Sequence, residues 1–213
     1  MKKYIAEFIG TFALVFCGTG AIVINDVTGG TISHVGVATT FGLIVMVIIY
    51  SFGNISGAHI NPAVTIAFSL TDRFDRKGLF GYLVAQLLGA FFASGILRML
   101  FPEHDNLGAT IPFGGWSQSF VLEIILTYLL MVVILFVSQN KLVTQYTAIA
   151  VGATVLLEAM FAGPITGASM NPARSIAPAV VSGRISGIWL YIAAPIIGAI
   201  LASLTWRILK EET

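Results

Sequence analysis

GASMNPARSIAP, residues 167–178, holds an Asn-Pro pair, an arginine and a second proline, although strongly apolar segments flank it on both sides. Polar residues and irregular backbone are costly at membrane depth, where no water is present to satisfy them. We therefore expect this stretch to have a special structural or functional role.

The composition is that of a membrane protein. The 213 residues are 57% hydrophobic and only 10% charged, whereas soluble domains carry roughly 25% charged residues. A bilayer-spanning helix needs about 20 apolar residues, and six segments of that length are present. Glu7 falls inside the long first segment, so we interpret that segment as an uncleaved span and not a signal peptide. The six predicted spans are approximately 4–24, 34–53, 80–101, 118–138, 145–163 and 187–208.

The basic residues predict the orientation. With both termini in the cytoplasm, eight Lys and Arg residues lie on the inner side and only Arg98 and Arg184 on the outer side. Such a bias is the positive-inside rule, and it predicts a multi-pass protein with both termini in the cytoplasm. The compact length and the lack of a recognisable targeting sequence favour the plasma (cell inner) membrane. The eight inner residues are Lys2, Lys3, Arg73, Arg76, Lys77, Lys141, Arg207 and Lys210.

Charge and cysteine content exclude other classes. The net charge is +1 without a basic patch, which gives no indication of a nucleic-acid partner. The single cysteine, Cys17, excludes an internal disulfide and a thiolate metal cluster, and we expect it to be a small buried hydrophobe. No nucleophile–base pair, phosphate loop or cofactor motif is present, so an enzyme is not indicated.

The chain repeats itself. ISGAHINPAVT (55–65) aligns with ITGASMNPARS (165–175), with six of eleven positions identical, and LLGAFFAS (87–94) aligns with IIGAILAS (196–203). Each half has three spans, so the second half enters the membrane from the opposite face. We therefore predict one channel domain, 1–213, made of inverted repeats of approximately 1–107 and 108–213. Such repeats place their site near the midplane.

The Asn-Pro pairs predict two half-helices. Pro172 suits the first turn of a helix and Asn171 is a good N-cap. From Asn171 to about Val181 there is room for about three turns, near 16 Å, which is half a membrane. We predict a second half-helix from Asn61-Pro62-Ala63 to about Leu70, with the two N-termini meeting at the bilayer centre. The preceding segment 163–170 carries Pro164 and is predicted to be non-helical.

Two Asn-Pro-Ala boxes, in SGAHINPAVT and TGASMNPARS, with an arginine after the second only, resemble the aquaporin, or major intrinsic protein, family. The resemblance covers essentially the whole chain. It implies a passive pore with Asn61 and Asn171 donating to the permeating oxygen at its centre. The half-helix N-termini add positive potential there, which repels cations and breaks proton hopping. The box residues that build these half-helices are Pro62, Ala63, Pro172 and Ala173.

The resemblance also implies an outer selectivity filter formed by Phe41, Ala159, Ala168 and Arg174. Water-selective members usually have histidine at the position of Ala159, so the two alanines predict a wider opening. The run LEAMFAGPITGASMNPARSIAPA is more similar to the nodulin-26-like branch, which carries glycerol, urea and uncharged metalloid acids. Glycerol facilitators typically differ at Ser175 and Ala179, however. A strictly water-selective channel therefore stays an alternative to one for water and small neutral solutes.

Three acidic residues and one histidine remain as candidates. Glu7 and Glu123 hold matching places in the two halves, and the family resemblance implies that they accept hydrogen bonds from the re-entrant loops. The alternative is a proton relay in a proton-coupled transporter. Glu158 has no acidic counterpart and could face a subunit contact, the outer vestibule or a hydrogen-bonding partner. His59 is predicted to line the inner vestibule, and a lone histidine is not a metal site.

Small residues recur every four positions at Ala85, Gly89 and Ala93, and again at Ala194, Gly198 and Ala202. Such spacing lets helices pack closely in lipid, and we expect these residues to join the two halves of one subunit. The family resemblance implies a homotetramer with one pore in each subunit.

Overall fold

The computed structural model describes residues 1–210 as an all-helical protein. Six helices are long and apolar enough to cross a membrane, and two are half that length. This confirms the predicted six spans and two half-helices. The long helices are α1 (Lys2–Val27), α2 (Ser33–Ser56), α4 (Leu79–Leu100), α5 (Trp116–Val137), α6 (Thr147–Thr166) and α8 (Ile188–Leu209). The half-helices are α3 (Pro62–Leu70) and α7 (Pro172–Ser182), and short 3-10 turns form at Arg76–Gly78 (η1) and Thr144–Tyr146 (η2).

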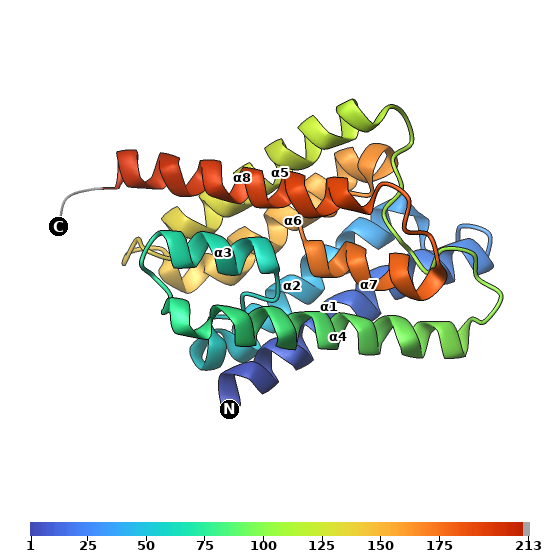
Figure 1. Ribbon diagram of the computed structural model, residues 1–213, viewed down its shortest axis with the longest axis horizontal. Coiled ribbons are helices and arrows are strands. Elements are labelled where there is room, and N and C mark those ends of the chain that lie inside the picture. Colours follow the sequence, from blue (N-terminus) through green and yellow to red (C-terminus); the bar gives the residue numbers. More distant parts are fainter. Residues whose placement is uncertain (211–213) are drawn as a thin grey trace.

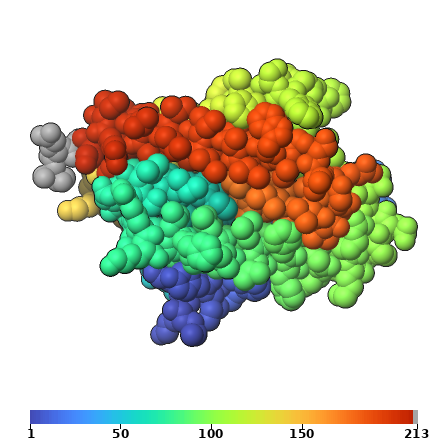
Figure 2. All heavy atoms as spheres, viewed as in Figure 1, coloured from blue at the N-terminus to red at the C-terminus, as the bar shows by residue number. Residues whose placement is uncertain are grey.

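The two half-helices lie end to end across the middle of the molecule. Figure 1 shows α3 and α7 pointing in opposite directions between α8 and α4, with their N-terminal ends toward each other. The space-filling view shows their atoms filling the surface between α8 and α4 (Figure 2). Together the two helices therefore take the place of one further span.

Capping residues set the length of each half-helix. Each begins at a proline after an asparagine N-cap in extended conformation, with φ −156° at Asn61 and −148° at Asn171. Proline at the first position loses no helical hydrogen bond, because the first N–H groups of a helix have no partner within the helix. The second half-helix ends at Gly183, whose φ of +77° is the left-handed conformation typical of a glycine that ends a helix.

The two glycines of the small-residue pattern pack against helices of their own half, not of the other half, so the expectation was wrong for these two residues. A Cβ at Gly89 of α4 would lie 2.3 Å from the Phe8 carbonyl oxygen of α1. A Cβ at Gly198 of α8 would lie 2.4 Å from the Ile124 carbonyl oxygen of α5. The spacing pattern indicates close packing but not the partner helix, which is why the sequence misassigned it.

A different glycine pair joins the halves. A Cβ at Gly42 of α2 would lie 2.6 Å from the carbonyl oxygen of Gly152 in α6, and a Cβ at Gly152 would lie 2.7 Å from that of Gly42. Both positions belong to the repeat, since 42 and 152 differ by 110. Helices α2 and α6 therefore meet through equivalent glycines, which bring their backbones together at this point.

The segment before the second half-helix is more helical than expected. Helix α6 continues through Pro164 to Thr166, whereas the sequence predicted a non-helical segment from 163. Proline cannot donate to the carbonyl four residues earlier, which here belongs to Met160. His34 Nε2 lies 2.6 Å from that carbonyl oxygen and supplies the missing hydrogen bond, so the helix tolerates the proline.

The outward faces of the long helices are apolar. Leu88 and Phe92 on α4 and Leu157 and Phe161 on α6 are each at least 56% exposed. Cys17 is only partly buried, whereas the sequence predicted a buried position. An apolar outer surface of this kind suits contact with lipid tails.

We expect Gly89→Ala to destabilise the protein, because its methyl group would meet backbone that cannot move aside. Overpacking of this kind costs about 1–3 kcal/mol. A Cβ added at Gly95 on the same helix would have no atom within 4 Å, so Gly95→Ala serves as the matched control. Thermal denaturation in detergent should show a lower midpoint for Gly89→Ala only. Equal midpoints for the two variants would contradict the assigned packing.

Candidate functional site

The two box asparagines hold the half-helices together at their N-termini. Asn61 Oδ1 accepts from Ala63 N at 2.9 Å, and Asn171 Oδ1 accepts from Ala173 N at 3.0 Å. These bonds fix both side chains with their amide groups directed away from their own helices. The capping role of both asparagines is thus visible, and it leaves their NH₂ groups available to other partners.

The amide groups bridge the two halves. Asn61 Nδ2 donates to the Met170 carbonyl at 2.7 Å, and Asn171 Nδ2 donates to the Ile60 carbonyl at 2.9 Å. An amide nitrogen carries two hydrogens, so each keeps one donor beyond this bridge. Both asparagines line the same cavity, which brings two fixed N–H donors from opposite halves to one point.

The loop before each half-helix has a strained backbone. In the first loop Gly57, Ala58 and Ile60 have φ values of +84°, +46° and +45°. Non-glycine residues rarely adopt positive φ, and they do so where the surrounding structure enforces it. The second loop repeats the pattern at Gly167, Ala168 and Met170, with φ values of +81°, +40° and +53°. Strong partners are therefore needed to hold both loops.

Glu7 supplies those partners in the first half. Its Oε1 accepts from the Ser56 hydroxyl at 2.7 Å and from His59 N at 2.9 Å. Its Oε2 accepts from Ile60 N at 2.6 Å and from the Gln86 amide at 2.8 Å. The carboxyl group is fully buried, and four donors surround it.

Glu123 does the same in the second half with one donor fewer. It accepts from the Thr166 hydroxyl at 2.6 Å, Ser169 N at 2.8 Å and Met170 N at 2.9 Å. The repeat aligns Gln86 with Pro195, which has no side-chain donor. Both glutamates are engaged with loop donors, and this favours the structural interpretation over a proton relay.

Arg174 lies against the cavity beside an aromatic ring. It is 2% exposed, its Nη1 donates to the Gly108 carbonyl at 2.8 Å, and its guanidinium carbon lies 5.0 Å from the centre of the Phe41 ring. Within residues 1–210 its Nε has no hydrogen-bond partner. The guanidinium is thus anchored at one nitrogen by the α4–α5 loop and lies over the Phe41 ring, an arrangement favourable for a cation.

One cavity brings together the predicted pore-centre, filter and vestibule residues. Its remaining wall is mainly aliphatic, with Val45, Val151 and Val155 among the lining residues. A largely apolar wall with a few fixed polar groups is typical of sites for small molecules. The predicted residues that line it are Phe41, His59, Asn61, Ala159, Ala168, Asn171 and Arg174.

His59 lines the same cavity within an aromatic cluster. Its Nδ1 lies 3.2 Å from the Thr65 hydroxyl, and its ring centre lies 4.7 Å from Phe68, 5.1 Å from Phe74 and 5.1 Å from Tyr82. The described residues contain no group of three or more potential metal ligands. The ring is therefore held by packing and one hydroxyl.

Glu158 is buried, with only 3% of its surface exposed, and neither carboxyl oxygen has a hydrogen-bond partner within residues 1–210. It does not line the cavity that contains its neighbour Ala159. Of the three environments considered for it, neither a hydrogen-bonding partner nor an exposed contact surface is found among the described residues.

Sequence reasoning missed several supports of the loops. Tyr82 donates to the Ser56 carbonyl at 2.8 Å, and Tyr191 donates to the Thr166 carbonyl at 2.7 Å. The two tyrosines are 109 positions apart, so extending the repeat alignment could have found them. The Gly108 carbonyl that accepts from Arg174 could not be found from the sequence, because every residue has a backbone carbonyl and no residue type marks this one.

Comparisons with known proteins agree with one another. The model of the family described as major intrinsic protein matches residues 1–206. Aquaporin NIP1-1 of Zea mays is 47% identical over 99% of this chain and 75% of its own length. Nodulin-26 of Glycine max is 46% identical over 99% of this chain and 78% of its own length. The X-ray structure of the aquaglyceroporin from Plasmodium falciparum aligns with a TM-score of 0.88 and 27% identity, covering 98% of this chain and 96% of that one.

The two buried glutamates of the second half should respond differently to the same substitution. Glu123→Gln puts an NH₂ group against loop donors, and leaving a buried donor unpaired costs about 1–3 kcal/mol. Glu158→Gln loses no hydrogen bond and serves as the matched control. Thermal denaturation in detergent should show a lower midpoint for Glu123→Gln alone. An equal decrease of the midpoint in both variants would show that the loop contacts of Glu123 do not stabilise the protein.

Proposed function

Since the chain belongs to the major intrinsic protein family, we propose how its cavity works as a passive channel for water and small neutral solutes. The channel, and not an enzyme, is the function that its family and its aquaporin and aquaglyceroporin relatives support. The observation that carries the residue assignments is the pair of opposed amides, Asn61 and Asn171, on the wall of one cavity.

The opposed amides orient the permeating molecule. The second N–H of each asparagine donates to one oxygen at the point where the two half-helices begin. The positive ends of α3 and α7 meet at the same point and repel cations. A water molecule held there by its oxygen directs its hydrogens outward, which interrupts a hydrogen-bonded chain that could carry protons. Conduction is passive, because no step requires an energy source.

The filter is proposed to be a slot with one polar and one apolar side. Arg174 keeps donors free on its guanidinium, and these can bond the hydroxyl or carbonyl oxygen of a solute. The Phe41 ring offers contact to CH groups. Ala159 and Ala168 are small, so they leave room between these two walls. This arrangement suits glycerol, urea or an uncharged metalloid acid as well as water.

The surroundings of the channel follow from the same proposal. We place both termini in the cytoplasm, as the basic residues predict, and the protein itself in the plasma (cell inner) membrane. The two inverted repeats, approximately 1–107 and 108–213, form a single channel domain. The apolar outer faces leave surface for association with three further copies in a homotetramer, as expected for the family, and each copy contains its own pore.

Narrowing the filter should separate water from larger solutes. Ala159→His combined with Ala168→Thr is expected to lower glycerol permeability at least about tenfold, while water permeability stays within about twofold. Stopped-flow light scattering of proteoliposomes measures both, first with an impermeant osmolyte and then with glycerol. If wild-type protein conducts water but no glycerol, the channel is strictly water-selective. Unchanged glycerol flux in the double variant would refute the filter assignment.

A cysteine at the filter should make the channel sensitive to mercury. Cys17 does not line the cavity, so the wild-type flux is expected to persist in mercuric chloride. Ala168→Cys adds a thiol to the cavity wall, and its metallation should block the flux until a reducing thiol is added. A mercury-insensitive Ala168→Cys channel would place residue 168 outside the constriction.

A further inference from the structure

The loop between α4 and α5 contains a histidine that the proposed function does not use. His104 Nδ1 accepts a hydrogen bond from Leu107 N at 3.1 Å, and its Nε2 lies 3.4 Å from Asp26 Oδ2 at the end of α1. The side chain is only 8% exposed. His104 is therefore not a solvated loop residue but a link between α1 and its own loop.

These contacts define the proton positions on the ring. A nitrogen that accepts from a backbone N–H carries no hydrogen of its own. In the neutral ring the hydrogen must then be on Nε2, which faces Asp26. Protonation adds a hydrogen to Nδ1, so that Nδ1 becomes a donor directed at the Leu107 N–H. The Leu107 bond is lost when the ring becomes charged, while the contact with Asp26 becomes an ion pair.

The residues next to His104 hold the arginine of the filter. Leu107 is followed by Gly108, whose carbonyl accepts from Arg174 Nη1 at 2.8 Å. Leu107 has a φ of +52°, a conformation that a leucine adopts only when neighbouring contacts enforce it. Its side chain is fully buried. Loss of its N–H partner therefore acts on a strained residue adjacent to the anchor of Arg174.

We propose that His104 is a positioning residue for the filter, acting through Leu107 and Gly108 on Arg174. With a neutral ring the Gly108 carbonyl holds the guanidinium at the wall beside Phe41. With a charged ring the loop shifts and releases the guanidinium toward the cavity that it lines, which narrows the passage. Acidification on this side of the membrane then lowers the flux. This inference rests on the proposed channel function.

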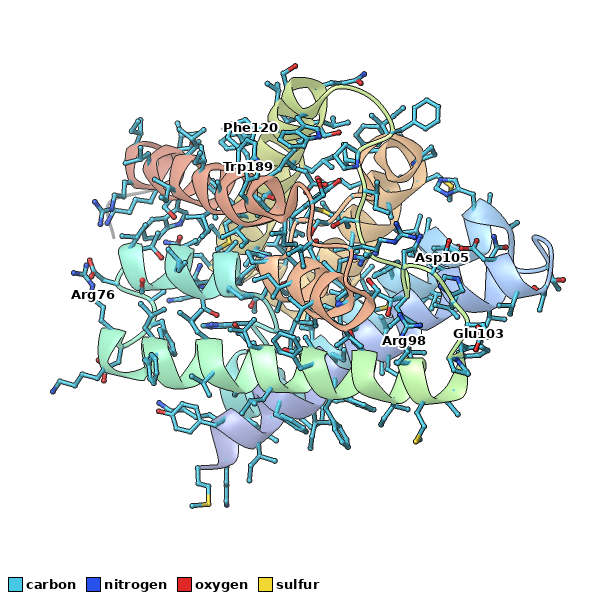
Figure 3. All side chains as sticks on the ribbon, turned by 45° about the vertical axis from the view of Figure 1, so that its right-hand side comes forward. Arg76, Arg98, Glu103, Asp105, Phe120 and Trp189 are labelled. Carbon is cyan, nitrogen blue, oxygen red and sulfur yellow. The ribbon has the colours of Figure 1, made fainter. Side chains whose placement is uncertain are left out.

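Several charged groups surround His104. Asp26 faces it directly, and Arg98 Nη1 donates to its backbone carbonyl at 2.8 Å. Glu103 and Asp105 are its chain neighbours, and Arg184 from the loop after α7 lies 3.7 Å from Asp105. Figure 3 shows Arg98 on the last turn of α4 with Glu103 and Asp105 on the loop that follows it, far from Arg76 at the other end of the molecule. Of these groups, Asp26 is the one whose side chain lies against the ring nitrogen.

The test is the pH profile of osmotic water permeability in proteoliposomes, measured by stopped-flow light scattering with equal pH on both sides. Wild-type flux is expected to be about threefold lower at about pH 5.5 than at about pH 7.5. His104→Asn keeps an oxygen acceptor near the Nδ1 position but cannot be charged. Its flux should match the wild-type value at neutral pH and stay constant on acidification.

Two further variants make the result specific. Asp26→Asn removes the carboxylate that favours the charged ring, so its flux should fall only at lower pH than in the wild type. Asp105→Asn removes a nearby carboxylate that pairs with Arg184 instead, and its profile should follow the wild type. If His104→Asn does not fold, the pH profile of Asp26→Asn tests the inference in its place.

A wild-type flux independent of pH would overturn the inference, as would a His104→Asn profile as steep as the wild type. An Asp26→Asn profile identical to that of the wild type would also contradict it. Each of these results leaves the proposed channel function intact. The absence of protein-dependent water flux at every pH would instead contradict the proposed function itself.

Discussion

Lipid tails offer no hydrogen bonds to a loop at the centre of a bilayer, so each backbone N–H group there that does not face the cavity needs a partner within the protein. Glu7 and Glu123 meet this requirement, because each accepts from two backbone N–H groups of one re-entrant loop and from a hydroxyl at its start. The positive φ angles of both loops are held by these bonds. Because the loops are held, the asparagine caps are in place, and because the caps are in place, their amides meet at one point of the cavity.

The residues that hold the two loops are repeated in both halves of the chain, but the residues that form the proposed filter are not. Equivalent residues in the two halves supply the glutamates, the asparagine caps, the loop hydroxyls and the tyrosines Tyr82 and Tyr191. Two differences stand out: Arg174, which lines the cavity, corresponds to Val64, and Gln86, which donates to Glu7, corresponds to Pro195. A repeated scaffold thus provides the central amides, while single substitutions in the second half provide the charged filter.

Much of this arrangement was predictable because it depends on local rules. Hydrophobic length predicted the spans, and Asn-Pro pairs predicted the half-helix starts, since capping involves only neighbouring residues. Contacts between distant segments were not predictable in the same way. The continuation of α6 through Pro164 depends on His34 from another helix, the partners of Gly89 and Gly198 depend on how the helices are arranged, and the anchor of Arg174 is a backbone carbonyl.

The central claim is that two opposed amides at one point let water pass without passing protons. The most direct test compares, in the same proteoliposomes, osmotic water permeability with the rate at which an imposed pH gradient decays. The account predicts that added protein raises water permeability while the decay of the pH gradient stays at the rate of protein-free liposomes. A pH gradient that decays faster in proportion to water permeability would contradict it.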